Sequence, residues 1–300
     1  MCRIMDVYTL KKSEPFFPDR WRKLSDAPSE IRVWGNLPVC SLVAIVGTRN
    51  ADARMMRFTE DLCSNLVRHD FGIVSGGALG IDTAAHRGAL EGGGRTIAVL
   101  GSGFEHIFPQ KNRGLFEKIA ENGAVISELP DCTPPTKWTF PRRNRLVAAM
   151  ASAVVVVQAP IRSGSMITAR IAKEIGVPVG AVPGGPTEYL ASGCNQLIRG
   201  GATLVTGAED VLKMTESDSY CQQLDLPGTV KQVMESTKKA PAGLSSVEQR
   251  IWDQLSLDSI HIDDIALRTK LPVHEVNAAV LNLELSGLIE DLGGRRFVRT

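Results

Sequence analysis

The sequence predicts an α/β protein with a doubly wound, mostly parallel Rossmann-like sheet, followed by a small C-terminal winged helix domain. Between residues 40 and 215, short β-branched runs that are apolar on both faces alternate with amphipathic stretches. This pattern is typical of a parallel sheet covered by helices on both sides. After residue 243, three helical stretches precede a hairpin pattern. The predicted divisions are an N-terminal extension (1–39), the Rossmann-like domain (40–214), a linker (215–242) and the winged helix domain (243–300).

Six short runs are expected to form the strands of the sheet. Each is rich in Val, Ile or Ala and carries no charge, as a strand buried on both faces requires. The runs are LVAIVG (42–47), GIVS (72–75), TIAVLG (96–101), AVIS (124–127), AVVVVQ (153–158) and VPVGAV (177–182).

Helices are expected between these strands, where apolar residues recur at intervals of three and four. In the first of them, Met55, Leu62 and Leu66 share one face. The expected helices cover 52–68, 81–90, 111–120 and 167–175, and a further helix-like run from residue 139 leads into the fifth strand.

The C-terminal part is expected to hold three helices and a β-hairpin. The helices lie within SSVEQRIWDQL (245–255), which opens with a Ser cap signal, HIDDIALRTK (261–270) and PVHEVNAAVLNLELSG (272–287). The hairpin has Gly293 and Gly294 at its turn. Three helices followed by a hairpin describe a winged helix-turn-helix.

The charge of this C-terminal domain argues against duplex recognition. Residues 243–300 hold nine acids and six bases, a net charge of −3 in a chain whose net charge is +1. The helix at 272–287 is the one that would enter a major groove, yet it has two acids and no Lys or Arg. A helix that contacts DNA should be basic. We expect this domain to contact protein, or to touch DNA only through Arg295 and Arg296.

Bulk properties exclude several classes of protein. With a net charge of +1, any anionic partner must be held by local charge. The start of the chain is not a secretory signal, and the longest uncharged apolar stretch (146–160) is shorter than the roughly 20 residues that a membrane helix needs. The six cysteines form no C-x-x-C pair, so free thiols are expected. A cytoplasmic protein is predicted.

Ligands of doubly wound sheets bind beyond the carboxyl ends of the strands. The sequence there holds loops rich in Gly, Ser and Thr, each followed by a helix start whose N–H groups suit an anion. Arg49 and Arg162 lie in two of these loops, and Arg142, Arg143 and Arg145 stand at the head of the run from residue 139. Arginine binds phosphate in a bidentate fork. We therefore expect a ligand with several phosphates.

Motifs of common enzymes and cofactor sites are missing. There is no G-x-G-x-x-G after the first strand, no G-x-x-x-x-G-K-[ST] and no G-x-S-x-G. The five histidines show no paired metal spacing. The sequence therefore predicts no catalytic residue, no cofactor and no metal.

Some of these residues allow two interpretations. Gly76, Gly77 and Gly80 either shape a tight turn or line the phosphate site. Asp82 and His86, four residues apart on a helix, are either a metal or acid/base pair, or a capping carboxylate and a structural hydrogen bond. The second interpretation of the pair is favoured.

The residues around the arginine cluster are also open to two interpretations. Trp138 and Phe140 are either core residues or stack on bases. Taken alone, Arg142, Arg143 and Arg145 would be a solvated face. Four other anion-suited loops at the same sheet edge favour a ligand site instead.

Eight strings occur in order and with compatible spacing between residues 35 and 212. They are VGTR, SGGALGIDTAAHRGAL, GGRTIAVLGSG, ISELP, FPRRNR, RSGSMIT, VPGGP and GCNQLIRGGA. Together they resemble the pattern of the DNA-processing protein A (DprA/Smf) family, many members of which also end in a winged helix. No single string carries the resemblance.

The resemblance implies a protein that binds single-stranded DNA through the Rossmann-like domain and forms a homodimer. It also implies a role in loading a RecA-type recombinase onto incoming DNA during natural transformation, without chemistry of its own. Asn195 would support a neighbouring loop. Carried over motif by motif, the residues that contact DNA would be Arg49, Ser75, Gly76, Arg143, Asn144, Arg145, Arg162, Ser163, Gly164 and Ser165.

The chain departs from the family pattern at several points. Arg162 replaces the usual Lys, which keeps the charge, and Gln158 replaces the usual Glu. We expect the N-terminal helical domain of many relatives to be absent, because the first 35 residues leave no room for it.

An enzyme of related fold is the alternative. The loop PGGPTEYLASG resembles the P-G-G-x-G-T-x-x-E motif of the LOG phosphoribohydrolases, interrupted by Pro186. Asp82, His86 and Glu188 would then be acid/base residues acting on a nucleoside monophosphate. The interrupted motif makes this alternative the less favoured one.

Overall fold

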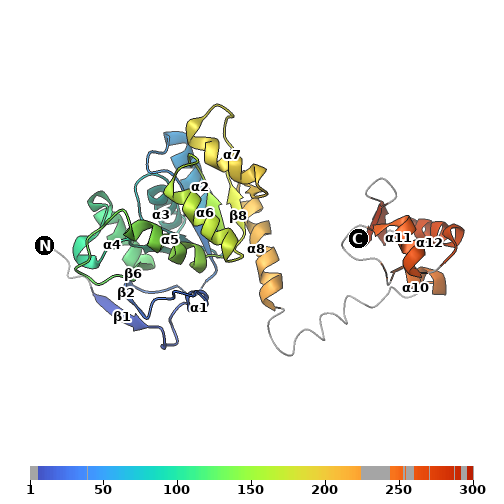
Figure 1. Cartoon of the computed structure of the whole chain (residues 1–300), viewed down its shortest axis with the longest axis horizontal. Coiled ribbons are helices and arrows are strands. Elements are labelled where there is room, and N and C mark those ends of the chain that lie inside the picture. Colours follow the sequence, from blue (N-terminus) through green and yellow to red (C-terminus); the bar gives the residue numbers. More distant parts are fainter. Residues whose placement is uncertain are drawn as a thin grey trace. The chain divides into compact units, whose positions relative to one another are not determined.

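The computed structural model describes residues 6–38, 40–223, 244–252, 254, 260–269, 271–286, 288–291 and 296–299. Its contacts divide the chain into two compact units, Met1–Cys221 and Gln222–Thr300. Figure 1 shows a sheet with helices in the first unit and a small helical domain in the second. Within the part of the chain that the structure describes, every helix falls short of the length and hydrophobicity needed to cross a bilayer.

The first unit is built on one nine-stranded sheet. Its strands are β1 (Val7–Lys11), β2 (Glu30–Gly35), β3 (Leu42–Val46), β4 (Gly72–Ser75), β5 (Thr96–Val99), β6 (Ala124–Ser127), β7 (Ala153–Val156), β8 (Val179–Ala181) and β9 (Thr203–Leu204). The order across the sheet is β1-β2-β6-β5-β4-β3-β7-β8-β9. The strands from β6 to β9 are parallel, while β2 is antiparallel to β6 and β1 to β2. The prediction of a mostly parallel sheet is confirmed, and all six predicted strands are present.

The order of the strands reverses in the middle of this sheet. From β3 the chain adds β4, β5 and β6 on one side, and then returns to add β7, β8 and β9 on the other. β3 and β7 are neighbours, paired from Val43↔Ala153 to Val46↔Val156. Such a switch point leaves a crevice beyond the carboxyl ends of the two strands. The loops that leave these two strands carry Arg49 and Arg162.

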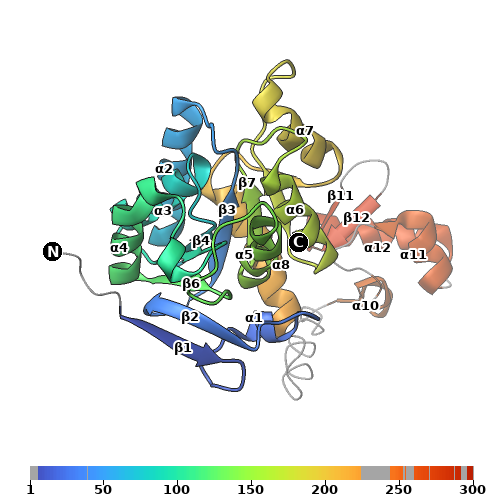
Figure 2. The ribbon, with the colours of Figure 1, turned by 60° about the vertical axis from the view of Figure 1, so that its left-hand side comes forward.

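Helices cover both faces of the sheet (Figures 1 and 2). One face carries α2 (Ala53–Arg68), α3 (Ile81–Glu91), α4 (Arg113–Asn122) and α8 (Ala208–Gln223), and the other carries α1 (Asp19–Arg22), α5 (Thr139–Met150), α6 (Gly164–Glu174) and α7 (Ser192–Arg199). The helices α2, α3, α4 and α6 lie where the sequence predicted them, within a few residues. Single 3₁₀ turns occupy Phe104–His106, Gln110–Asn112 and Tyr189–Ala191.

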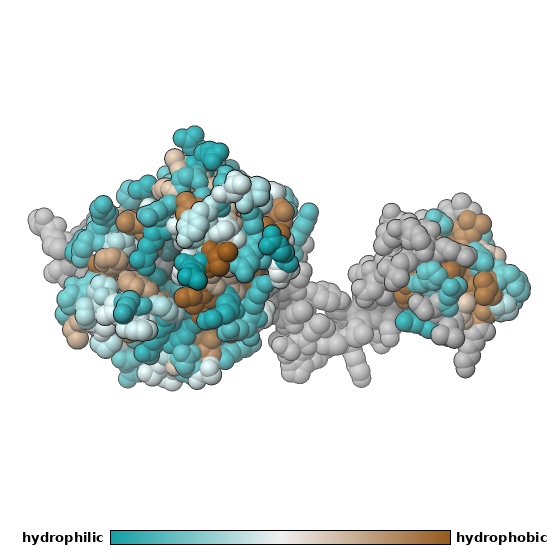
Figure 3. Space-filling view, turned by 45° about the horizontal axis from the view of Figure 1, so that its top comes forward, coloured by the Kyte–Doolittle hydropathy of each residue, from teal (hydrophilic) through white to brown (hydrophobic). Residues whose placement is uncertain are grey.

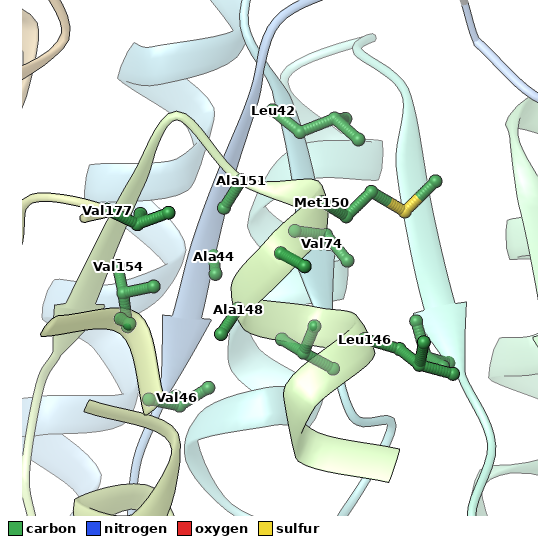
Figure 4. Close-up of a cluster of buried hydrophobic side chains, with 14 of the residues drawn as sticks. Leu42, Ala44, Val46, Val74, Leu146, Ala148, Met150, Ala151, Val154 and Val177 are labelled. Atoms are coloured by element: carbon green, nitrogen blue, oxygen red, sulfur yellow. The ribbon is translucent and has the colours of Figure 1, made fainter. Parts of the chain in front are cut away.

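Strand β3 shows why the central strands are apolar runs and not alternating patterns. Leu42, Ala44 and Val46 point toward α5, which lies over the strand in Figure 4. Val43 and Ile45 point to the opposite layer, against α2 and α3. All five side chains are buried. A strand buried on both faces gains about 25 cal/mol for each Å² of apolar surface removed from water, with no face left for polar residues.

The outer surface contrasts with this core. In the view of Figure 3 the described surface of the first unit is mostly hydrophilic, with small apolar patches separated from one another. Scattered apolar residues of this kind are normal on the surface of a folded protein.

The segment before residue 39 is part of the same sheet. It contributes β1, β2 and the short helix α1, whose Trp21 is completely buried and donates a hydrogen bond from Nε1 to the Leu146 carbonyl at 2.8 Å. Phe17 packs edge-on against Trp21, with ring centroids 6.1 Å apart. At the other end, α8 continues to Gln223, so residues 215–223 of the predicted linker are helical. The rest of that linker lies outside the described residues.

The second unit has the predicted winged helix architecture. Helices α10 (Ser246–Trp252), α11 (Ile262–Thr269) and α12 (Val273–Leu285) accompany a three-stranded sheet of β10 (Ile260–His261), β12 (Arg296–Arg299) and β11 (Ile289–Asp291), in that order. At the start of α10, the Ser245 N–H donates to the Glu248 carboxylate at 2.8 Å, and the Glu248 N–H donates to Ser245 Oγ at 3.3 Å. This reciprocal capping box explains the predicted cap signal. The predicted turn at Gly293 and Gly294 lies outside the described residues.

The adjacent residues Phe16 and Phe17 test whether the N-terminal segment is integral to the fold. Phe17 is 1% exposed and Phe16 is 77% exposed. We expect Phe17→Ala to lower the free energy of unfolding by about 3–5 kcal/mol, because it leaves a cavity beside Trp21. Phe16→Ala should change it by less than about 0.5 kcal/mol. Urea unfolding followed by tryptophan fluorescence measures both, and equal stabilities would show that the segment is not part of the core.

Candidate nucleic-acid interface

A groove of about 650 Å³ lies at the switch point of the sheet. Its walls come from the loops after β3, β4 and β7 and from the start of α5. Arg49, Arg143 and Arg162 all line it. Three guanidinium groups that are far apart in the sequence therefore meet in one groove, together with the N-terminus of α6.

Arg49 is an exposed side chain at the edge of the groove. Its guanidinium carbon lies 5.1 Å from the centre of the Phe140 ring, a cation–π distance. The Phe108 ring lies beside Phe140, with centroids 5.9 Å apart, and both rings line the groove. Phe140 is half-buried and Trp138 is 75% exposed, with Lys137 5.2 Å above its ring. Trp138 and Phe140 were interpreted either as core residues or as rings that stack on bases. The structure places neither ring fully in the core.

The loop that carries Arg49 is held by Gln158 at the end of β7. The Thr48 N–H donates to the Gln158 carbonyl at 2.6 Å. The side chain of Gln158 is buried; its Nε2 donates to Asp52 Oδ2 at 2.6 Å, and its Oε1 accepts from the Asp52 N–H at 3.2 Å. Asp52 in turn caps α2 by accepting from the Met55 N–H at 2.9 Å.

This arrangement gives a reason why Gln stands at position 158, where the family pattern usually has Glu. The hydrogen bond from the Met55 N–H, followed by the one from Gln158, lowers the pKa of Asp52 below its ordinary value. The carboxylate is therefore a strong acceptor, and an amide at position 158 can donate to it. An ionised Glu at that position could not donate a hydrogen bond to Asp52. It would also place a second negative charge beside the Asp52 carboxylate.

Arg143 forms the floor of the groove. It is 5% exposed, and its Nη1 donates to the Gly76 carbonyl at 2.5 Å and also to the Val99 carbonyl, while Nε donates to Asn144 Oδ1 at 3.1 Å. Burial lowers the pKa of Arg143 to about 10, although the nearby Asp82 opposes this shift. A Cβ at Gly76 would lie 2.6 Å from the guanidinium, so a larger residue there would displace Arg143 from its place.

Asp82 lies next to Arg143 in the first turn of α3. It is 6% exposed, and its Oδ2 accepts from the Ala78 N–H at 3.3 Å. Burial raises the pKa of Asp82, while Arg143 acts in the opposite direction. The helix begins at Gly80, where φ is +76° and a Cβ would lie 2.3 Å from the Thr48 carbonyl oxygen. This glycine brings the start of α3 against the Arg49 loop.

The N-terminus of α6 forms the other wall of the groove. Ser163 occupies the position before the helix, with its Oγ 3.0 Å from Ser165 Oγ. Asn144 donates from Nδ2 to the Gly164 carbonyl at 3.2 Å and so joins α5 to this helix start. Arg162 is exposed beside them. The N–H groups at a helix start and the positive end of the helix dipole suit an anion at this position.

Three of the expected site residues lie outside the groove lining. Ser75 is fully buried and donates from Oγ to the Ile45 carbonyl at 2.6 Å. Arg145 is buried and forms ion pairs with Asp26 at 2.6 Å and Glu128 at 2.7 Å. Asn195 is paired twice with the backbone of Gly184, accepting from its N–H at 3.2 Å and donating to its carbonyl at 3.0 Å.

Direct DNA contact, which the resemblance implies for Ser75 and Arg145, does not fit these positions. The physical reason for Arg145 is the helix period: residues two apart point to nearly opposite sides of α5, so only one of Arg143 and Arg145 can face the groove. Arg142 is exposed, with its Nε 3.6 Å from a Glu128 carboxylate oxygen. Ser75 and Arg145 support the groove from behind.

The three acid/base residues expected for a phosphoribohydrolase do not lie together in the groove. Of Asp82, His86 and Glu188, only Asp82 lines the groove. His86 is completely buried with Nδ1 2.7 Å from Thr96 Oγ1, and burial lowers its pKa to about 3, so it is neutral. Glu188 is exposed and accepts from the Gly185 N–H at 3.3 Å. Across the described residues, no group of three His, Cys, Asp or Glu side chains could hold a metal.

Sequence reasoning missed part of the lining. Thr136 and Lys137, from the loop before α5, and Phe108, from the loop after β5, also face the groove. The TKWTF string just before the arginines was a usable signal for the first two. Nothing local marked Phe108, because only the fold brings its loop against Phe140.

The chain belongs to the DNA recombination-mediator protein A family. The sequence model of that family matches residues 8–216, and a model described as the DprA winged helix domain matches residues 235–295. The resemblance seen in the motifs is thereby confirmed.

Individual relatives agree with this assignment. The chain is 35% identical over 277 residues to the protein Smf of Synechocystis sp., covering 86% of this chain and 70% of the relative. It is 39% identical over 254 residues to a putative DNA processing protein DprA of Mycobacterium tuberculosis, covering 84% of this chain and 63% of the relative.

Two solved structures are similar to the first unit. The X-ray structure of DprA from Streptococcus pneumoniae has a TM-score of 0.67 at 38% identity, covering 69% of this chain and 74% of that chain. DNA processing protein A of Helicobacter pylori, described for its single-stranded DNA binding mode, has a TM-score of 0.64 at 31% identity, covering 71% and 97%.

The Gln158–Asp52 pair provides a test of how the Arg49 loop is held. We expect Gln158→Glu to lower the free energy of unfolding at neutral pH by about 1–3 kcal/mol, because it replaces a buried donor with a second carboxylate. The loss should shrink as the pH falls and one of the two carboxylates takes up a proton. The matched control is Gln196→Glu, an exposed position on α7. Equal urea-unfolding curves for the two variants would contradict this role of Gln158.

Proposed function

We propose that this protein binds single-stranded DNA and mediates the loading of a RecA-type recombinase during DNA uptake and recombination, without catalytic activity of its own. One observation carries the proposal: Arg49, Arg143 and Arg162 share a single groove with the N-terminus of α6. Guanidinium groups and helix N–H groups are the donors that a sugar-phosphate backbone requires. Family membership supports the same function.

The groove residues divide into contacts and supports in this proposal. Arg49, Arg162, Ser163, Gly164 and Asn144 are exposed or half-buried, and they contact the phosphates. Behind them, Arg143 fills the floor against Gly76, and Ser165 is bonded to Ser163 at the helix start. Ser75, Arg145 and Asn195 hold the surrounding loops by the contacts described above.

The aromatic side chains favour single strands over duplex. Phe108 and Phe140 line the groove. Trp138, two residues before Phe140 in the sequence, is exposed. Stacking of bases on aromatic rings is worth about 1–3 kcal/mol per base and tolerates any sequence. Only unpaired, splayed bases offer their faces to such rings, so the groove selects single strands.

The proposed function includes no catalytic activity. His86 is neutral and bonded to Thr96, and Glu188 is bonded within its own loop, so neither of the other two acid/base candidates lines the groove with Asp82. General acid–base catalysis needs such a partner within hydrogen-bond reach of the substrate. A binding role therefore fits the groove better than phosphoribohydrolase activity.

The recombinase and the homodimer complete the proposed function. A loader must hold the strand and also present a surface to another protein. The second unit offers one: Glu275 and Glu284 lie on α12 together with the exposed Leu281, which suits protein contact better than duplex DNA. We expect sedimentation equilibrium to give twice the chain mass of 32.4 kDa.

Substitution of the exposed arginines tests the DNA site. We expect Arg49→Ala and Arg162→Ala each to weaken binding to single strands of every sequence, and to reduce the slope of log K against log salt by about 1, because each removes a phosphate contact. The control is Arg68→Ala, an exposed arginine at the C-terminal end of α2. Fluorescence anisotropy at two salt concentrations measures the effect. Unchanged affinity in both groove variants would overturn the proposed function.

Loading can be tested separately from binding. We expect the wild-type protein to accelerate assembly of the host's RecA-type recombinase on single strands already covered by single-strand-binding protein, detected as recombinase ATP hydrolysis. The Arg49→Ala/Arg162→Ala double variant should lose this acceleration. If the wild type binds single strands but leaves the ATP hydrolysis rate unchanged, the protein is a DNA-binding protein without the mediator role.

A further inference from the structure

Helix α12 of the second unit is apolar on two sides. The side that packs into its own domain consists of Val276, Ala279, Val280 and Leu283, all of them buried. Ala278 and Leu281 are also apolar but exposed, and Leu281 is 54% exposed. A helix at the surface of a domain normally has one apolar face and one charged face. In α12 the second apolar side is not covered by any described residue of its domain.

The exposed residues of α12 form a line along the helix. Successive helix residues are about 100° apart, so His274, Ala278 and Leu281 lie within about 60° of one another around the axis. All three are exposed, and they lie opposite the buried side of the helix. This outward line of His274, Ala278 and Leu281 extends over about two helical turns.

Acidic side chains lie on both flanks of the outward line. Glu275 and Glu284 are each about 90° away from it, on opposite sides. Glu284 is exposed and Glu275 is half-buried. On the flank of Glu275, Asn282 donates from Nδ2 to Glu248 Oε1 at 3.1 Å and so holds a third carboxylate there. An apolar line between acids is complementary to a helix whose apolar residues are flanked by Lys or Arg.

The same charges argue against two other occupants. Duplex DNA would bring phosphates toward these acids, and α12 contains no Lys or Arg to bind them. A second copy of α12 would bring further acids and again no cation. Like charges that face each other across an interface lower its stability. The occupant that fits is therefore a basic amphipathic helix of a different protein.

Resting on the proposed loading function, we propose that the outward line of α12 docks the RecA-type recombinase through a helix with Lys or Arg beside its apolar residues. Leu281 is the main apolar contact, because it is the largest exposed apolar side chain of the line. The acids on the flanks orient the partner and accelerate its association. The first unit then binds the strand and the second unit binds the protein that is to be loaded on it.

Truncation of Leu281 tests the apolar contact. We expect Leu281→Ala to weaken binding of the full-length protein to the host's recombinase by about 5- to 30-fold, the range for an alanine substitution at a central contact. Anisotropy of fluorescently labelled recombinase, titrated without DNA, measures the affinity. The matched control is Ile175→Ala, which truncates an apolar side chain of the first unit that is 41% exposed. Wild-type affinity in Leu281→Ala would overturn the proposal.

Reversal of a flanking charge tests the second half of the proposal. We expect Glu284→Lys to weaken the same interaction by about 3- to 10-fold at low salt, because it places a cation against the cations of the partner. The difference from the wild type should shrink as salt is added and the charges are screened. The control is Asp61→Lys, at an exposed acid of α2. Tighter binding by Glu284→Lys would show that the partner is acidic and would refute the proposed chemistry.

Strand binding and recombinase loading, measured on the same variants, separate this inference from the proposed function. Leu281→Ala should bind single strands like the wild type, because the groove lies in the first unit, and should lose the acceleration of recombinase ATP hydrolysis. If the wild type itself gives no acceleration, the mediator function is wrong. If both proteins accelerate equally, that function stands and the docking surface is wrong.

Two further results would also decide. If Leu281→Ala changes the sedimentation of the protein alone and leaves its affinity for the recombinase unchanged, the outward line is a contact between copies of this chain and the proposal fails. If Leu281→Ala does not fold, the salt dependence of Glu284→Lys against the wild type gives the answer by itself.

Discussion

The buried guanidinium of Arg143 is the interaction around which the groove is built. A cation that leaves water is costly unless hydrogen bonds replace its hydration. Here the Gly76 and Val99 carbonyls, both just at the carboxyl ends of strands, accept its hydrogen bonds, and Asp82 lies close enough to favour its charge. The start of α5 is thereby fixed to the ends of β4 and β5, and the loops around it have to accommodate that position.

Three consecutive residues fasten α5 to three different neighbours. Arg143 is bonded to the sheet edge, Asn144 to the first residue of α6, and Arg145 to Asp26 and Glu128. Because successive helix residues point about 100° apart, one short string can serve three directions. The arginines at the start of α5 are therefore partly structural residues. The exposed cations of the groove are Arg49, Lys137 and Arg162, which come from the loops around α5.

The central sheet and its switch point could be predicted from sequence because their signal is local. Apolar runs with glycine-rich ends identify buried parallel strands, and their carboxyl ends locate the ligand site. The strands β1 and β2 gave no such signal, since VYTLK and EIRVWG each bury only some of their residues at the antiparallel edge. The partners of Arg145 and Gln158 were also unpredictable: Asp26 and Asp52 lie 119 and 106 residues away in the chain, and only folding brings them together.

Charge in the groove is sorted by depth, and this sorting bears on how single strands are distinguished from duplex. The exposed rim holds Arg49, Lys137 and Arg162, while the buried floor holds Arg143 together with the carboxylate of Asp82. In the proposed function, a single strand keeps its backbone against the exposed donors of the rim and turns its bases toward the aromatic rings. A duplex cannot do so without breaking a pair, because its Watson–Crick edges already bond to each other and only its phosphates are free. In the proposed function, the exposed cations account for the affinity that any strand shares, and the rings of Phe108 and Phe140 account for the preference for single strands.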